Sequence, residues 1–140
     1  MLFRSQAISV LRDGSARSVA DSLAEKLFAA ETPGEVRQKW HGIMAGSSPE
    51  GVAYALRAMA TRPDSTPTLA TIDVPTLIVV GDQDQVTPPE IARAMHAEIR
   101  GSRLEVIPGA GHLTPVEQAA RFTEVLREFL EGLPEESEKA

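Results

Sequence analysis

The sequence predicts an α/β protein in which a helical segment precedes a short parallel sheet. Apolar residues recur at helical spacing from residue 16 to residue 62, whereas "TLIVV" (76–80) and "RLEVI" (103–107) are short apolar runs rich in β-branched residues. A helical pattern over residues 88–99 separates the two runs. A strand, helix and strand in this order form a right-handed crossover, which makes the two strands parallel.

The first half of the chain reads as three amphipathic helices. "TPGE" (32–35) and "SPE" (48–50) each offer an N-cap hydroxyl, a proline in the first turn and a glutamate. We expect residues 1–66 to form one helical segment. The apolar residues that define its three helical faces are Val19, Ala20, Leu23, Leu27 and Phe28, then Val36, Trp40, Ile43 and Met44, and then Val52, Leu56 and Met59.

The second half, residues 67–133, reads as a βαβα unit that is followed by a polar tail over 134–140. Its first strand is apolar on both faces, so we expect both faces to be buried. Its second helix runs over residues 115–130. "TPPE" (87–90) and "TPVE" (114–117) precede the two helices, and each predicts a threonine N-cap with a reciprocal glutamate.

Composition excludes several classes of function. The 140 residues contain 14 Lys and Arg against 20 Asp and Glu, a net charge of −6, and no basic run. An anionic partner such as a nucleic acid or a membrane surface is therefore not expected. The chain has no cysteine, which excludes a disulfide and a thiolate nucleophile and agrees with a cytoplasmic location. His41 and His96 have no second ligand at metal spacing, so we expect no metal.

One histidine lies where chemistry is expected. Parallel strands end at the same edge of a sheet, so the loops "GDQDQV" (81–86) and "GAGH" (109–112) should be neighbours. A carboxylate that binds one imidazole nitrogen leaves the other free to accept a proton. We expect Asp84 to reach His112 and Asp82 to bind turn amides, and we expect the following helix N-terminus to disfavour a positive charge on His112. An ordinary cap contact for His112 and an Asx turn for the aspartates are the structural alternatives.

These residues also carry a family resemblance. "VPTLIVVGDQDQVTPPE" followed by "LEVIPGAGHLTPVEQAARFTEVLREFL" resembles the C-terminal half of an α/β-hydrolase fold enzyme. The resemblance implies that Asp84 and His112 are the acid and the histidine of a catalytic triad that needs no cofactor. It also implies that 1–66 is a helical cap like that of esterases, lactonases of the 3-oxoadipate enol-lactonase type and perhydrolases. The expected fold is thus the C-terminal part of an α/β-hydrolase parallel sheet, two strands with flanking helices, preceded by a helical cap.

The serine nucleophile of that family follows a strand in a G-x-S-x-G elbow, and no such elbow occurs in these residues. "GSARS" and "GSS" lie in the helical half, and Ser102 precedes a strand. We therefore expect this chain to be the C-terminal portion of a serine hydrolase, with its nucleophile upstream and no activity when alone. The alternative is a non-catalytic module that associates with itself or with a complementing N-terminal half through its sheet edge.

The resemblance implies a small carboxylic ester, thioester or lactone as the substrate, with haloperoxidase or perhydrolase chemistry as the variant. A helical cap would line the substrate pocket. Packing between the cap helices is the alternative role for each of the aromatic and methionine side chains that we expect there, which are Trp40, Met44, Tyr54 and Met59, with Phe28 as a further candidate.

Overall fold

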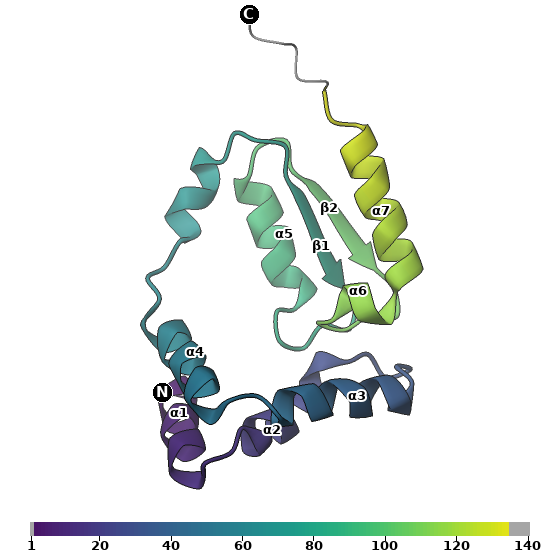
Figure 1. Ribbon diagram of the computed structural model, residues 1–140. Coiled ribbons are helices and arrows are strands. Elements are labelled where there is room, and N and C mark those ends of the chain that lie inside the picture. The colour runs from purple at the N-terminus through teal and green to yellow at the C-terminus, as the bar shows by residue number, and fades with distance from the viewer. Residues whose placement is uncertain (1, 135–140) are drawn as a thin grey trace, which may run out of the picture.

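The computed structural model describes residues 2–134, and it describes side chains from residue 8 onward. A helical segment comes first and an α/β segment follows it (Figure 1). The elements in chain order are α1 (Leu2–Asp13), α2 (Arg17–Leu27), α3 (Gly34–Ala45), α4 (Pro49–Thr61), the 3-10 helix η1 (Thr66–Thr71), β1 (Leu77–Gly81), α5 (Pro89–Glu98), β2 (Arg103–Ile107), α6 (Thr114–Glu117) and α7 (Ala119–Glu131).

The two strands are parallel, as the sequence predicts. Leu77 lies opposite Arg103, and Gly81 lies opposite Ile107. The crossover helix α5 and the last long helix α7 lie on either side of the strand pair (Figure 1). The predicted fold class, two parallel strands with flanking helices after a helical segment, is confirmed.

The core of the α/β segment lies mainly on one side of the sheet. Ile78 and Val80 pack there against Ala92 and Ile99 of the α5 region. On the opposite face, Leu77 and Val79 are only half-buried, so the expectation of a strand buried on both faces is wrong for the described chain. With β2 as its only partner among the described residues, β1 has too little sheet around it to bury both faces.

The helical segment contains four helices, one more than the periodicity predicts. The additional helix is α1, which packs against α4. Val10 of α1 is fully buried in a cluster with Val19, Ala53 and Leu56. Within residues 2–134, no helix is both long enough and apolar enough to cross a membrane.

Only one of the four predicted hydroxyl caps is present. Ser48 Oγ accepts the N–H of Gly51 at 3.2 Å, as predicted for the start of α4. The predicted caps at Thr32, Thr87 and Thr114 are wrong, because these hydroxyls instead donate to Glu117, to Asp84 and to the Gly111 carbonyl. The acceptor of Thr32 is distant in the sequence, whereas those of Thr87 and Thr114 lie three residues earlier in the chain.

The single helix predicted over residues 115–130 is also interrupted. α6 is one short turn, and α7 begins after Gln118, whose φ of −129° and ψ of 52° are not helical. The break lets α6 lie under the end of β1 while α7 runs back along β2.

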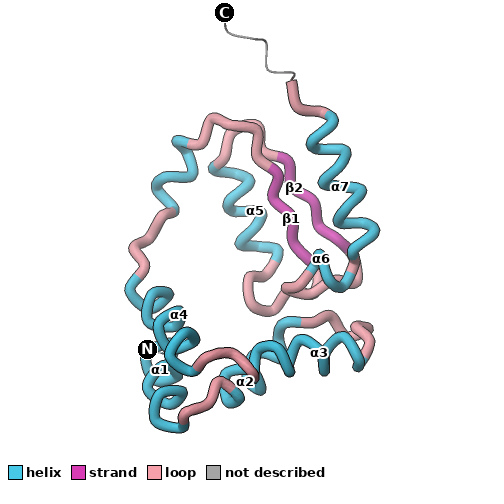
Figure 2. The backbone as a smooth tube through the Cα atoms, in the orientation of Figure 1, coloured by secondary structure: helices cyan, strands magenta, loops and turns pink. Residues whose placement is uncertain are grey.

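The carboxyl ends of the strands face the helical segment. In Figure 1 the arrowheads of β1 and β2 point towards α2 and α3, and Figure 2 shows loop segments between these elements. The fold therefore brings the loop after β1, the loop after β2 and the α2–α3 connection together at one edge.

Candidate active site

The loops after β1 and β2 are in direct contact. Gln83 N–H donates to the Ala110 carbonyl at 2.9 Å, and Asp82 Oδ1 accepts the N–H of Gly109 at 2.8 Å. A Cβ atom on Gly81 would lie 2.2 Å from the Ala110 carbonyl oxygen. Only glycine permits the end of β1 to approach the second loop this closely.

Asp84 and His112 meet across these loops. Asp84 Oδ2 lies 2.9 Å from His112 Nδ1, although the two residues are 28 positions apart. The Asp84 side chain is 5% exposed and that of His112 is 35% exposed. The carboxylate is thus buried behind the imidazole, and part of the ring faces outward.

Asp84 accepts hydrogen bonds on both of its carboxylate oxygens. Oδ1 accepts the N–H groups of Val86 at 2.8 Å and of Thr87 at 2.9 Å, and Oδ2 accepts the Thr87 hydroxyl at 2.9 Å as well as His112. Burial by itself raises the pKa of Asp84, but hydrogen bonds from His112, Thr87 and Val86 outweigh it and hold that pKa below its ordinary value. Asp84 is therefore ionised at neutral pH.

The ionised carboxylate fixes the tautomer of the histidine. A carboxylate only accepts hydrogen bonds, so Nδ1 of His112 must carry the proton that points to Asp84. Nε2 of the neutral ring then holds a lone pair. Within the described residues Nε2 makes no hydrogen bond, so this nitrogen can act as a base towards a hydroxyl group within hydrogen-bond distance of it.

The backbone of the His112 loop is held from two directions. Gly109 has a φ of +68°, a left-handed conformation that favours glycine, and its carbonyl accepts Gln118 Nε2 at 3.0 Å. His112 N–H donates to the Leu27 carbonyl, at the end of α2, at 2.8 Å. The helix after His112, α6, has only four residues, and the effect of its N-terminus on this ring stays a prediction.

A hollow of about 250 Å³ adjoins the pair. Its walls are mainly apolar side chains of β1 and α5. Two of these, Ile91 and Met95, are 53% and 36% exposed. The residues that line it are Ile78, Val79, Val80, Asp84, Thr87, Ile91, Ala92, Met95, His112 and Thr114.

None of the four predicted substrate-pocket residues lines that hollow. Met44 and Met59 line a second hollow of about 180 Å³ between α2, α3 and α4. Tyr54 is 71% exposed and lines a third, of about 430 Å³, between α1 and α4. Trp40 is half-buried on α3, and Phe28 is buried in the α2–α3 connection. Their role in substrate binding stays a prediction.

The remaining histidines have other partners. His41 Nε2 lies 2.6 Å from Asp21 Oδ1, which joins α3 to α2. His96 Nδ1 lies 2.8 Å from Ser102 Oγ, at the end of β2 away from His112. No three His, Asp or Glu side chains converge as a metal site in the described part of the chain.

Sequence reasoning missed three polar side chains that hold the site. Thr87 fixes Asp84, Gln83 Oε1 accepts the N–H of Ala30 at 2.9 Å, and Glu117 Oε1 accepts the N–H of Gly111 at 2.9 Å. Thr87 and Glu117 belong to the two T-P-x-E phrases, so the sequence marks them as hydrogen-bonding residues. It does not identify their partners.

Comparison with known proteins agrees with this geometry. Residues 2–125 match the model of the alpha/beta hydrolase family. The chain therefore belongs to the α/β-hydrolase family. The strand pair, its two loops and the preceding helices are all parts of that match.

Individual relatives are hydrolases. The chain is 38% identical over 89 residues to pimeloyl-(acyl-carrier protein) methyl ester esterase of Neisseria meningitidis. The aligned residues make up 64% of this chain and 28% of the relative. It is 34% identical to 3-oxoadipate enol-lactonase 1 of Acinetobacter baylyi, over 69% of this chain and 35% of the relative. Among solved structures, a thermophilic esterase from Thermogutta terrifontis matches with a TM-score of 0.87 and 39% identity, over 92% of this chain and 48% of that chain.

The chain thus spans about a third of the length of these curated relatives and about half of that solved structure. The match to the solved structure includes both the helical and the α/β segments.

Proposed function

We propose that this chain supplies the acid and the histidine of a serine hydrolase that acts on a small carboxylic ester, thioester or lactone. The observation that carries the proposal is the hydrogen bond between buried Asp84 and half-exposed His112. The activities of the relatives, an esterase and an enol-lactonase, support the substrate class.

In this proposal the nucleophile is a serine hydroxyl from outside these 140 residues. His112 Nε2 takes the hydroxyl proton while the serine oxygen attacks the acyl carbon, and Asp84 stabilises the resulting imidazolium. The imidazolium then gives its proton to the leaving alkoxide or thiolate, which leaves an acyl-serine. Nε2 then deprotonates a water molecule, whose oxygen attacks the acyl carbon of the acyl-serine. The resulting imidazolium returns this proton to the serine oxygen as the carboxylic acid leaves.

We further propose that residues 1–66 act as the cap of this enzyme and that residues 67–133 are part of its core. The helical segment lies at the carboxyl edge of the strands, where α/β proteins bind ligands (Figure 1). Met44 and Met59 line an apolar hollow within the helical segment, and methionine adapts to acyl chains of different shape. In an active complex, Met44→Ala should raise KM for a longer acyl ester more than it lowers kcat.

The experiment is complementation. The part of the Thermogutta terrifontis esterase that this chain does not match is expected to carry the G-x-S-x-G elbow, and it would be co-expressed with this chain. We expect hydrolysis of p-nitrophenyl acetate by the co-purified pair, none by either part alone, and none with His112→Ala. The same part with its own natural complement is the positive control. Activity of the pair that survives His112→Ala would contradict the proposal.

The free edge of β1 favours one second candidate, a non-catalytic module. β1 pairs only with β2 among the described residues, so its other edge offers unpaired backbone groups to a strand of another chain. Stable association without hydrolysis, in the presence of an active positive control, would favour this alternative.

A further inference from the structure

The connection between α2 and α3 has no regular secondary structure, yet its backbone is paired by side chains. Phe28 and Ala29 in this connection are 3% and 1% exposed. The N–H of Ala29 donates to Glu117 Oε2 at 2.7 Å, and the N–H of Ala30 donates to Gln83 Oε1 at 2.9 Å. Both acceptors belong to the α/β segment, so side chains of that segment bind the backbone of the α2–α3 connection.

Glu117 binds both sides of this junction. Oε1 accepts the N–H of Gly111, which precedes His112, and Oε2 accepts the N–H of Ala29 and, at 2.5 Å, the hydroxyl of Thr32. The half-buried carboxylate thus joins the histidine loop to a connection 88 residues earlier in the chain.

The joined backbones are in contact as well. His112 N–H donates to the Leu27 carbonyl at 2.8 Å. A Cβ atom on Gly111 would lie 2.7 Å from Leu27 O, Phe28 C and Ala29 N. The histidine loop therefore cannot shift independently of the connection.

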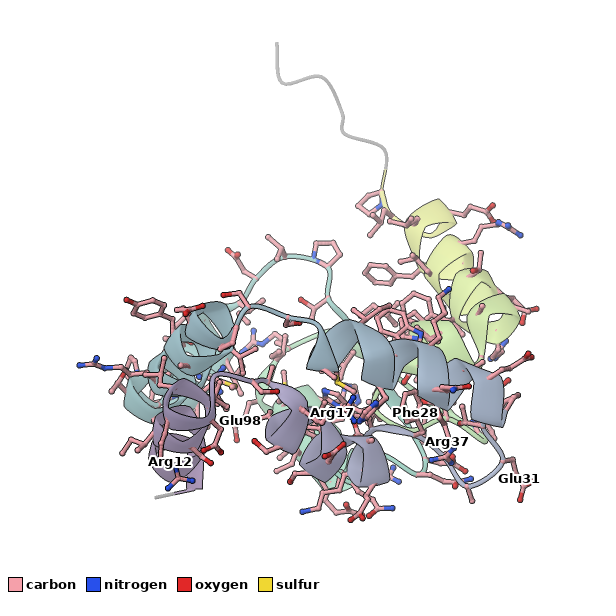
Figure 3. All side chains as sticks on the ribbon, turned by 60° about the horizontal axis from the view of Figure 1, so that its bottom comes forward. Arg12, Arg17, Phe28, Glu31, Arg37 and Glu98 are labelled. Carbon is pink, nitrogen blue, oxygen red and sulfur yellow. The ribbon has the colours of Figure 1, made fainter. Side chains whose placement is uncertain are left out.

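Arg37 of α3 binds backbone carbonyls of the α2–α3 connection. Its guanidinium donates to the carbonyls of Ala29, Ala30 and Thr32 and lies 5.4 Å from the centre of the Phe28 ring. Figure 3 shows Arg37 and Phe28 together beside α3, with Glu31 pointing away from them into solvent. The connection is thus fixed to α3 by Arg37 and to the histidine loop by Glu117.

We propose that Glu117 is a positioning residue that couples the helical segment to the orientation of the His112 ring. When the α2–α3 connection is docked, Glu117 holds the Gly111 amide, and the ring stays directed at Asp84. When the connection moves, the His112 amide loses the Leu27 carbonyl and Glu117 loses the two donors that fix its Oε2, so the loop that carries the ring is no longer held in place. The significance for catalysis rests on the proposed function, whereas the coupling itself is a property of this chain.

The test uses the hydrogen-bonded Nδ1 proton of His112, detected by NMR in the 15N-labelled 140-residue chain. Glu117→Ala removes the bridge, and we expect the exchange of this proton with water to accelerate about tenfold, the factor that corresponds to about 1.4 kcal/mol for a hydrogen bond to a charged group. Glu117→Gln keeps the shape and one acceptor oxygen, so it should restore part of the protection. A general loss of packing would not be repaired selectively by the amide.

The matched control is Glu31→Gln, in the same connection but exposed, which should change nothing. Wild-type exchange of the Nδ1 proton in Glu117→Ala, with faster exchange at the Ala29 amide, would overturn the coupling, because Glu117 would then hold the connection alone. If Glu117→Ala does not fold, the variants Glu117→Gln and Thr32→Val test the coupling in its place. Each should accelerate both the Ala29 amide and the Nδ1 proton, and acceleration of the amide alone would overturn the proposal.

The complementation assay separates the two proposals. Coupled exchange in an inactive complex would leave Glu117 as a positioning residue and reject the hydrolase function. An active complex in which the two exchange rates are not coupled would support the hydrolase function and reject Glu117 as a positioning residue.

Discussion

Nδ1 of His112 lies 2.9 Å from Oδ2 of Asp84, while the other aspartate of the same turn, Asp82, binds the Gly109 amide instead. The two carboxylates of this one turn therefore bind different groups. Asp84 is buried and directed at the imidazole, and Asp82 is exposed and joins the two loops. The difference follows from position, because Asp84 lies further beyond the end of β1.

This division predicts unequal effects of two substitutions in the complemented hydrolase. Asp84→Asn should lower kcat by about 10⁴-fold, because an amide neither selects the Nδ1–H tautomer nor stabilises the imidazolium. Asp82→Asn removes one exposed backbone contact, so its effect should stay below about tenfold. Steady-state kinetics with p-nitrophenyl acetate measure both. Equal losses, or a larger loss for Asp82→Asn, would reject Asp84 as the triad acid.

The lowered pKa of Asp84 predicts a pH dependence of stability. The native state holds this carboxyl ionised at pH values where the unfolded chain, with an ordinary pKa of about 3.9, begins to bind a proton. The stabilisation is therefore fully present above about pH 4 and is lost as pH falls through the native pKa.

Urea unfolding of wild type and Asp84→Asn between about pH 2.5 and 6 isolates this contribution. The exposed carboxyls with lowered pKa values, such as Glu128, are common to both chains and cancel in the difference. We expect the advantage of wild type to be constant above about pH 4 and to shrink below it. An advantage that grows as the pH falls would contradict the assigned direction.

Short-range patterns predict the strand pair and the facing loops well. "TLIVV" and "RLEVI" are apolar runs of strand length with a helix between them, and the parallel crossover follows from chain chirality. Once the strands are parallel, their carboxyl ends must be neighbours, and this places Asp84 near His112 without knowledge of any other contact.

The partners of Thr32 and Glu117 could not be predicted in this way. Each residue lies in a phrase that permits a local cap, and the sequence does not reveal that a stronger tertiary partner is within reach. For Glu117 that partner is 88 residues away. The break at Gln118, which directly follows Glu117, could not be predicted from the apolar spacing either.

The correctly predicted cap at Ser48 has a measurable energy. Ser48→Ala removes the acceptor of the Gly51 amide at the start of α4 and should lower the free energy of unfolding by about 1 kcal/mol. Ser22→Ala, at an exposed position within α2, is the control and should leave stability unchanged or slightly raised. Urea unfolding followed by circular dichroism measures both. Equal effects of the two changes would show that the hydroxyl of Ser48 does not stabilise α4.

The last prediction concerns the contact between Gly111 and the α2–α3 connection. Gly111→Ala would place a methyl group 2.7 Å from three backbone atoms, and backbone atoms cannot rotate away as the end of a side chain can. Gly111 does not have a positive φ, so the cost arises from this contact and not from backbone conformation. The connection must withdraw, and the bond from His112 N–H to the Leu27 carbonyl must lengthen with it. We expect a loss of about 1–3 kcal/mol in the free energy of unfolding and faster exchange of the Ala29 amide.

Gly42→Ala is the matched control, because a Cβ at that position of α3 meets no atom within 4 Å. Alanine also favours the helix by about 1 kcal/mol, so Gly42→Ala should stabilise the chain. If Gly111→Ala unfolds at the same urea concentration as wild type, then the histidine loop and the α2–α3 connection are not packed as tightly as the structure places them.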